Sequence, residues 1–202
     1  MNNKTWYQER SIPWRRGWLA YGPAGTGKSN LSSIVAKILN VRLYNMVLST
    51  MTDQDFREAW RDLELPCVVL LDDFDTVFNG RENVTPHKAL SFETVLQTIS
   101  GVKSCDGVFL MITTNHIEKI DPAIGVDIND SGMSTRPGRI DRVIYMGPAC
   151  DEVKSKLISK ILVDWPHLHE EVLRQTTDYT VAQVIEKCRE VAFEQMKLNQ
   201  SH

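Results

Sequence analysis

One short segment, residues 22–29, limits what this chain can be more than any other. Its sequence, Gly-Pro-Ala-Gly-Thr-Gly-Lys-Ser, matches the phosphate-binding pattern G-x-x-x-x-G-K-[ST] in full. An apolar run at 18–21 leads into it, and apolar residues at helical spacing follow it from Leu31 to Leu39. A strand, a glycine-rich loop and a helix in this order wrap phosphate groups. The segment therefore predicts a site for a nucleoside triphosphate.

Each residue of this loop has an expected role. The glycines let backbone N–H groups turn toward phosphate oxygens, because no Cβ stands in the way. Lys28 is expected to neutralise charge on the β- and γ-phosphates of ATP, and the Ser29 hydroxyl to ligate Mg²⁺. The residues expected to hold the nucleotide are Gly22, Pro23, Ala24, Gly25, Thr26, Gly27, Lys28 and Ser29.

The remaining apolar pattern predicts an α/β fold. Strand-like runs alternate with helical patterns, which favours a parallel sheet covered by helices on both faces. After Gly147-Pro148 only helical patterns follow. We therefore expect a nucleotide-binding domain at 1–148 and a small helical lid at 149–202. The expected strands are 18–21, 42–48, 67–71, 108–113 and 142–146; the expected helices are 28–39, 53–64, 89–100, 150–163, 168–175 and 180–196.

Composition excludes several other classes of protein. The 202 residues carry a net charge of −3, so no basic excess points to nucleic acid. The four cysteines lie about 40 residues apart without a C-x-x-C pair, which argues against disulfides and a zinc site. The sequence contains no apolar run of about 18 residues, so it predicts no membrane segment. The N-terminus does not resemble a signal peptide. We expect a soluble protein of the cytoplasm or another intracellular compartment.

Two carboxylates follow the apolar run at 67–71. A buried strand that ends in acids places them beside the metal ion, at the carboxyl end of a parallel sheet. Asp72 is expected to hold Mg²⁺, largely through its water shell, because Mg²⁺ gives up water reluctantly. Asp73 is expected to orient and polarise the attacking water.

Two further elements complete the expected catalytic set. Asn115 follows the apolar run at 108–113, where its amide could bind the γ-phosphate or hold the attacking water beside Asp73. Arg136 and Arg139 lie in the segment Arg-Pro-Gly-Arg-Ile-Asp. Such arginines can stabilise charge that develops on the γ-phosphate, an effect worth ~10³–10⁵ in rate.

These four elements, in this order, resemble the AAA ATPases, with their Walker A, Walker B, sensor 1 and arginine-finger motifs. The sequence is most similar to the branch of the mitochondrial AAA translocase that inserts the Rieske iron–sulfur protein. The similarity covers roughly residues 5–147 and is weak over the lid. The stretches that carry it are Trp6-Tyr7 with Ile12-Pro13-Trp14-Arg15-Arg16-Gly17, then 90–102, and then 113–123.

The resemblance implies more than the residues alone. It implies a five-stranded sheet in the order 5-1-4-3-2 and a homo-oligomeric ring of six or seven subunits with ATP between them. Arg136 and Arg139 would then act on the neighbouring subunit's nucleotide. Trp6, Tyr7 and Ile12 would lie near the adenine. The implied function is Mg²⁺-dependent ATP hydrolysis that remodels or translocates a macromolecule, whose identity the sequence does not give.

Two departures from the family pattern leave alternatives open. Most AAA proteins have Glu where this chain has Asp73, so a slow or non-hydrolysing nucleotide-dependent scaffold or regulator is the alternative. A motor of the DNA-replication type is another, although the charge pattern does not favour it. Residues Gly125 to Thr135 form an insertion directly before the two arginines, and we expect it at the boundary between subunits.

Overall fold

The chain is described by a computed structural model that covers residues 4–100, 106–125 and 139–200. Its contacts divide it into two compact units. The first contains Met1–Gly22 and Lys28–Tyr145, and the second contains Pro23–Gly27 and Met146–His202. The domain boundary expected at residue 148 remains a prediction, since the contacts also group part of the phosphate loop with the helical unit.

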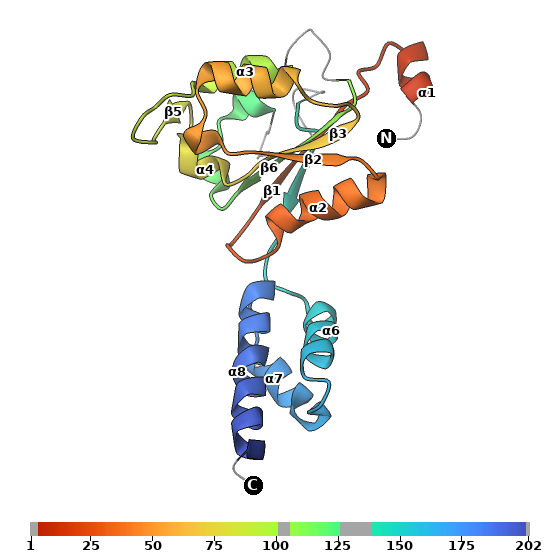
Figure 1. Ribbon diagram of the computed structural model, residues 1–202, viewed down its shortest axis with the longest axis vertical. Helices are drawn as coiled ribbons and strands as arrows, with labels where there is room; N and C mark the ends of the chain where they lie inside the picture. The colour runs from red at the N-terminus through yellow and green to blue at the C-terminus, as the bar shows by residue number, and fades with distance from the viewer. Residues whose placement is uncertain (1–3, 101–105, 126–138, 201–202) are drawn as a thin grey trace. The chain divides into compact units, whose positions relative to one another are not determined.

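Five parallel strands form the central sheet of the first unit (Figure 1). Across the sheet they lie in the order β2-β3-β6-β1-β7. Numbered from one to five along the chain and taken from the β7 side, this order is 5-1-4-3-2, so the predicted order is confirmed. The strands are β1 (Arg16–Tyr21), β2 (Arg42–Met46), β3 (Cys67–Leu71), β6 (Val108–Thr114) and β7 (Arg142–Tyr145).

The register of these strands brings the polar segments of the sequence to one edge. Tyr21 lies opposite Thr114, and Leu71 lies opposite Ile112. Because parallel strands run in one direction, the residues that follow β1, β3 and β6 emerge together. We call this the carboxyl edge of the sheet, and the edge at which the strands begin the amino edge.

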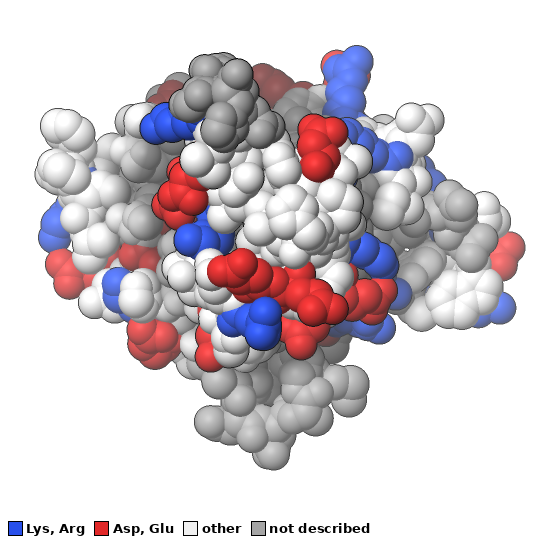
Figure 2. Space-filling view, turned by 90° about the horizontal axis from the view of Figure 1, so that it is seen from below, with Lys and Arg blue, Asp and Glu red and all other residues white. Residues whose placement is uncertain are grey.

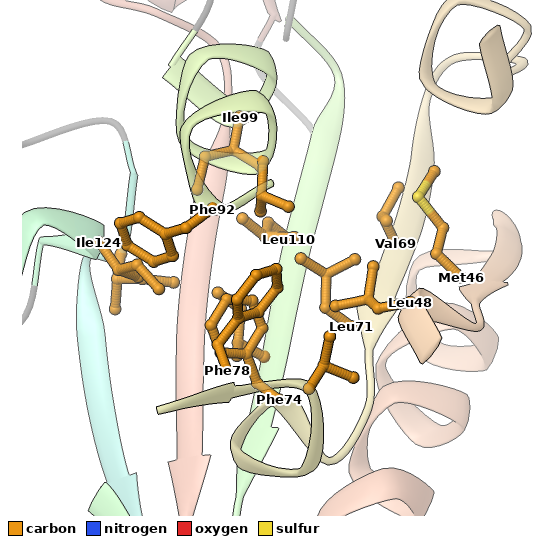
Figure 3. Packing of buried hydrophobic residues seen from close by; sticks show 14 of the residues in the cluster. Met46, Leu48, Val69, Leu71, Phe74, Phe78, Phe92, Ile99, Leu110 and Ile124 are labelled. Carbon is orange, nitrogen blue, oxygen red and sulfur yellow. The ribbon is translucent and has the colours of Figure 1, made fainter. Parts of the chain in front are cut away.

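Helices cover both faces of the sheet, as the apolar pattern predicted. On one face, α2 (Lys28–Leu39) packs on a cluster to which β3 contributes Val68 and Leu70. On the other face, Val69 and Leu71 join the larger cluster shown in Figure 3. Neighbouring residues of β3 thus face opposite sides, and both sides are apolar.

The larger cluster includes residues from three helices: α3 (Asp53–Arg61), α4 (Phe74–Val77) and α5 (Phe92–Ser100). Three aromatic rings form its centre. Phe74 and Phe78 lie 5.0 Å apart between ring centroids, and Phe78 and Phe92 lie 5.7 Å apart. Phe74 follows Asp73 directly, so burial of its ring anchors the chain next to the expected catalytic carboxylate.

Short elements complete the first unit. The sequence did not predict α1 (Lys4–Glu9), nor the two-stranded sheet of β4 (Phe78–Asn79) and β5 (Glu82–Asn83), which are too short for a periodic signal. The described residues of this unit also include the 3₁₀ turns η1 (Leu48–Thr50), η2 (Ile117–Lys119) and η3 (Pro122–Ile124).

The start of α3 agrees with its predicted capping residue. The Asp55 N–H donates to Thr52 Oγ1 at 3.2 Å, and the Thr52 N–H donates to Asp55 Oδ2 at 2.9 Å. This reciprocal pair is a capping box, and the bonds from Thr52 lower the pKa of Asp55. The helix ends at Arg61 rather than residue 64, and Pro66 disfavours helical geometry in the residue before it.

The helical unit contains α6 (Asp151–Ile161), the 3₁₀ turn η4 (Pro166–Leu168), α7 (His169–Gln175) and α8 (Val181–Gln200). Val184, Cys188 and Ala192 of α8 lie on one apolar face, at the spacing that the sequence indicated, and pack with Ile158 and Leu162. The polar side of α8 carries neighbouring opposite charges, such as the Arg189–Glu186 pair at 3.0 Å. On the face shown in Figure 2, several Asp and Glu side chains adjoin one another near the centre, with Lys and Arg side chains beside and around them.

Candidate active site

The phosphate loop has the backbone that its glycines predicted. Gly25 and Gly27 have φ angles of +79° and +96°, which strain any residue with a Cβ. A Cβ on Gly25 would also lie 2.9 Å from the Ala182 Cβ. The Gly25 carbonyl accepts the Ala182 N–H at 3.0 Å. Within the helical unit, the start of α8 therefore helps to define the loop.

Hydrogen bonds within and next to the phosphate loop fix several of its other residues. Thr26 is buried, and its Oγ1 donates to the Pro23 carbonyl at 3.1 Å, while Ala24 is exposed. The Gly22 carbonyl accepts a bond from Lys28 Nζ at 2.8 Å.

Lys28 is the first residue of α2, and its side chain is buried. In addition to the bond with Gly22, its Nζ donates to Asn115 Oδ1 at 2.7 Å. Removal from water lowers the pKa of Lys28, and nearby aspartates partly oppose this effect. The predicted phosphate-binding lysine and the predicted sensor 1 asparagine are therefore in direct contact at the carboxyl edge.

Ser29 and Asp72 form a pair that fits Mg²⁺. Ser29 Oγ donates to Asp72 Oδ1 at 2.8 Å, so a hydroxyl and a carboxylate lie side by side. Mg²⁺ prefers oxygen ligands and is held through one or two carboxylates, with water and phosphate oxygens filling the remaining positions. Among the described residues, no group of three or more His, Cys, Asp or Glu side chains could hold a metal ion. The pair therefore suits a metal ion that arrives with a nucleotide.

Asp73 has an unusual backbone conformation for a residue with a side chain. Its φ and ψ angles are 46° and 51°, in the left-handed region, where non-glycine residues are uncommon. Its N–H donates to Thr113 Oγ1 at 2.9 Å, and its Oδ1 accepts a bond from Asn115 Nδ2 at 3.4 Å. Local conformational strain of this kind is often found at functional sites. The chain thus turns sharply at Asp73 and presents its carboxylate to Asn115.

The electrostatic surroundings of Asp73 favour its neutral form. Loss of hydration raises the pKa of Asp73 from its ordinary value of 3.8, and the charges of Asp72 and Asp75 raise it further. Lys28 and the bond from Asn115 act in the opposite direction. A raised pKa brings a carboxylate nearer to the range in which a general base is effective.

Two other residues of this site, Thr113 and Asp75, have no predicted role in the sequence. Thr113 is buried, and its Oγ1 donates to Asp72 Oδ1 at 2.6 Å. Asp75 is 6% exposed, and its Oδ1 accepts bonds from Thr114 Oγ1 at 2.8 Å and from the Asn115 N–H at 3.0 Å. Polar residues at the ends of two neighbouring strands were the only sequence signal for these contacts.

Arg139 lies at the opposite edge of the sheet from Lys28 in the same chain. A Cβ on Gly17, the second residue of β1, would meet the Arg139 carbonyl, and Lys28 follows the other end of this strand. A six-residue strand spans roughly 17–20 Å. The Arg139 guanidinium donates to the Ala123 carbonyl. The structure thus brings Lys28, Ser29, Asp72, Asp73 and Asn115 together and leaves Arg139 apart from them.

Other expected residues lie elsewhere. Arg136 and residues 126–135 of the insertion lie outside the described residues. Tyr7 lies near the amino edge, where its hydroxyl accepts a bond from Arg16 at 2.8 Å. Trp6 packs edge-on against Tyr7, and the Ile12 N–H donates to the Tyr7 carbonyl at 3.0 Å. The structure therefore does not bring these three residues together with Lys28.

Within the described part of the chain, the helices are all too short or too polar to span a bilayer.

Comparison with known proteins identifies relatives of this chain. The chain is 33% identical over 177 residues to a probable mitochondrial chaperone BCS1 of Schizosaccharomyces pombe, covering 85% of this chain and 37% of that protein. It is 30% identical over 198 residues to the human mitochondrial chaperone BCS1, covering 91% of this chain and 45% of that protein.

An AAA-ATPase of Arabidopsis thaliana is 30% identical over 189 residues, which are 86% of this chain and 38% of the plant protein. The chain thus spans less than half the length of these relatives. The resemblance to the AAA ATPases and their mitochondrial chaperone branch is confirmed. The model of the ATPase family associated with various cellular activities (AAA) matches residues 18–147. This chain therefore belongs to the AAA family.

Proposed function

We propose that this chain binds ATP with Mg²⁺ and hydrolyses it between the subunits of a homo-oligomeric ring of six or seven copies. The observation that carries the proposal is the hydrogen-bonded series from Lys28 through Asn115 to Asp73, with the Ser29–Asp72 pair at the same edge of the sheet. Phosphate-binding, metal-binding and water-orienting groups meet there. The relatives named as chaperones support a role in remodelling or moving a macromolecule.

Each of these groups has a part in the proposed reaction. Lys28 and the loop N–H groups bind the phosphates and neutralise their charge. Ser29 and Asp72 would hold Mg²⁺, which would supply positive charge against the negative charge of the phosphates. Asp73 orients a water molecule for in-line attack on the γ-phosphorus, and its carboxylate can accept the proton, while the bond from the γ-phosphorus to the bridging oxygen breaks and ADP leaves with that oxygen. The Asn115 amide holds the Asp73 carboxylate and the γ-phosphate in fixed positions relative to each other.

The ring is proposed because one chain does not assemble every element. Arg139 lies at the amino edge, too far from its own Lys28 to reach the same phosphate. A ring whose contacts join the amino edge of one subunit to the carboxyl edge of the next would place Arg139 at the neighbour's nucleotide. Head-to-tail contacts of this kind generate closed rings. Arg136, three residues earlier, is proposed to act beside it.

The proposal is tested by measuring ATP binding, ATP turnover and particle mass on the same preparations. Lys28→Ala should abolish ATP binding because the phosphates lose their buried cation, while Lys37→Ala, on an exposed position of the same helix, should not. Turnover per chain should rise with protein concentration as the ring forms. Normal ATP affinity in Lys28→Ala would contradict the phosphate site, and concentration-independent turnover by a monomer would contradict the shared site.

A slow or non-hydrolysing nucleotide-dependent scaffold or regulator is the second candidate. The geometry of Asp73 favours it: its carboxylate is one methylene shorter than that of Glu, and its bond with Asn115 is long, at 3.4 Å. Single-turnover cleavage of ATP separates the two candidates, since a scaffold binds ATP without cleaving it on the time scale of assembly. Asp73→Glu should accelerate cleavage if the short side chain limits the rate.

A further inference from the structure

The amino edge of the sheet contains a cavity that the proposed ATP site does not use. Its volume is about 410 Å³, within the range of pockets that hold small organic molecules. Strands β1, β6 and β7, the segment before β1, and α1 all contribute to its wall. Its lining consists of aromatic and charged side chains: Tyr7, Trp14, Arg15, Arg16, Trp18, Phe109, Asp141 and Arg142.

The aromatic side chains provide a surface for a planar group. Trp18 and Phe109 meet edge to face with their ring centroids 5.0 Å apart. Tyr7 and Trp14 lie on the same cavity. Aromatic rings stack or meet edge to face with other rings and bury large areas on contact. A ligand with a ring therefore gains from this wall more than a simple inorganic ion does.

Two of the charged side chains already satisfy one another. Arg16 Nη1 lies 3.8 Å from Asp141 Oδ2, and the Arg16 guanidinium also donates to the Tyr7 hydroxyl. Asp141 Oδ2 accepts the Gly17 N–H at 3.0 Å. This pair joins the start of β1 to the residue before β7. Because its two opposite charges compensate each other, it attracts a charged ligand only weakly.

The side chains of the other two arginines, Arg15 and Arg142, have no such partners among the described residues. Arg15 Nε is buried and makes no hydrogen bond with the described residues, which is unusual because buried polar atoms are normally paired. The Arg142 guanidinium has no hydrogen-bond or ion-pair partner within 4–100, 106–125 and 139–200. Two unpaired guanidinium groups on one aromatic cavity are suited to bind an anion such as a phosphate or carboxylate.

This cavity is separate from the residues that meet around Lys28, and its aromatic wall lies on a different face of the sheet from Arg139. It lies at the amino edge, whereas Lys28 and Asp72 lie at the carboxyl edge. Trp18 and Phe109 belong to the apolar cluster on the α2 face of the sheet. Arg139 instead adjoins Ile99 and Leu110, which belong to the cluster on the opposite face. The aromatic wall of the cavity thus lies on the α2 face, whereas Arg15 and Arg16 border both the cavity and the space beside Arg139.

We propose that this cavity is a second ligand site, for a small organic anion that carries an aromatic ring. The ring packs against Trp18, Phe109 and Trp14, and the anionic group binds between Arg15 and Arg142. A nucleoside monophosphate and an aryl phosphate both have this chemistry. All of its lining residues come from one chain, so binding requires neither ATP hydrolysis nor a second subunit.

Phenyl phosphate is the simplest probe, because it has one ring and one phosphate. We would titrate it calorimetrically into the unmutated chain and into Lys28→Ala, with inorganic phosphate and adenosine monophosphate as parallel probes. The indole N–H signals of ¹⁵N-labelled protein locate the ligand. One molecule of phenyl phosphate should bind in both proteins and shift the Trp14 and Trp18 signals, while the Trp165 signal stays unchanged. Adenosine monophosphate should give the same pattern, and inorganic phosphate should bind more weakly.

Two variants test the arginines directly. Arg15→Gln and Arg142→Gln should each weaken phenyl phosphate binding by about ten-fold or more, because each removes a charged hydrogen bond. Arg189→Gln, which changes the net charge equally on an exposed part of α8, should not. Arg142 is exposed, so its variant keeps the test valid if Arg15→Gln does not fold.

Several outcomes would overturn the proposal. They are absence of phenyl phosphate binding, undiminished binding in both arginine variants, and loss of binding in Lys28→Ala, which would assign the probe to the phosphate loop. Equal affinity for inorganic phosphate and phenyl phosphate would exclude a ligand with an aromatic ring. None of these results depends on ATP turnover, so they leave the proposed function to its own test.

Discussion

The Thr113 hydroxyl joins the two carboxylate residues of the site. Its Oγ1 donates to Asp72 Oδ1 at 2.6 Å and accepts the Asp73 N–H at 2.9 Å. One buried side chain on β6 therefore orients the side chain of Asp72 and fixes the left-handed turn at Asp73. Hydrogen bonds thus join the end of β6 to the residues that follow β3, although 41 positions separate Thr113 from Asp72.

Thr113→Val removes this hydroxyl and keeps the shape of the side chain. We expect the fold to persist, because Val suits a buried strand, while kcat falls by about ten- to a hundred-fold as the carboxylates lose their alignment. Thr113→Ser retains the hydroxyl and should recover most of the loss. Steady-state ATPase assays and thermal unfolding check both variants. An unchanged kcat in Thr113→Val would show that this bond has no part in turnover.

Asp75→Asn should shift the acid limb of the ATPase pH profile. Asp73 acts as a base only when ionised, and its raised pKa means that activity is lost at a higher pH than for an ordinary Asp as the pH falls. The Asp75 charge contributes to this rise. Its removal lowers the pKa of Asp73, so the acid limb moves to lower pH. The dependence of kcat/KM on pH measures the shift.

Asp75→Ala is the matched comparison for that variant. Asn keeps an oxygen that can accept the bonds from Thr114 and Asn115, whereas Ala leaves both donors without it. We expect Asp75→Ala to lower kcat far more than Asp75→Asn. A shift of the acid limb toward higher pH in Asp75→Asn would contradict the assignment of Asp73 as the base.

Asn115→Ala should separate binding from turnover. Asn115 lies between Lys28 and Asp73, and the loop itself does not depend on its amide. ATP affinity should change by only a few-fold, because Lys28 and the loop N–H groups remain, while kcat should fall by about a hundred-fold. Equilibrium binding and single-turnover cleavage distinguish these effects. A loss confined to affinity would place Asn115 in nucleotide binding alone.

Mixed assemblies test whether Arg139 acts on a neighbouring subunit. Arg139→Ala lacks the proposed arginine, and Asp73→Asn lacks the proposed base, so each should be inactive alone. In an equal mixture, about one quarter of the interfaces join an intact nucleotide site to an intact Arg139 and should recover activity. The ATPase rate of the mixture, compared with the two separate proteins, measures this. A rate no higher than their mean would contradict action between subunits.

Asp53 should make the stability of the first unit depend on pH. Burial acts to raise the pKa of Asp53, but the bonds from Ser91 and Thr94 and the charge of Arg57 together outweigh it and keep the pKa below 3.8. The Ser91 N–H donates to Asp53 Oδ1 at 2.6 Å, and Ser91 Oγ donates to Oδ2 at 3.0 Å. Because the folded state holds the ionised form, this stabilisation is present above pH 3.8 and is lost as the pH falls through the lower folded value.

Asp53→Ala should therefore lower the free energy of unfolding at pH 7 by about 1 kcal/mol, a modest amount because the carboxylate is partly exposed. Urea unfolding at pH 7 and at pH 3 would measure the difference between variant and unmutated protein. Asp62→Ala, at the exposed end of the same helix, is the control. If the loss of unfolding free energy in Asp53→Ala were larger at pH 3 than at pH 7, it would contradict stabilisation by the ionised form of Asp53.

The sequence by itself predicted the five strands of the sheet and five residues that the structure brings together: Lys28, Ser29, Asp72, Asp73 and Asn115. The glycines of 22–29, the apolar strands and the acids after Leu71 are local signals, because each follows from backbone geometry or from the periodicity of burial. They were sufficient to predict the strand positions and the roles of Lys28, Asp72 and Asn115, and the family resemblance supplied the strand order. The short element α1 and the two-stranded sheet had too few residues to produce such a signal.

Only the tertiary structure decided how those residues meet. Thr113 and Asp75 acquire their roles because β3 and β6 are neighbours in parallel register, and no local pattern indicates which hydroxyl will face which carboxylate. The positions of Arg139 and the aromatic cavity likewise depend on the starts of β1 and β7 lying together. Hydrogen bonds form between residues distant in sequence only after burial of apolar surface has brought the strands together, so these contacts belong to the fold rather than to any segment of the chain.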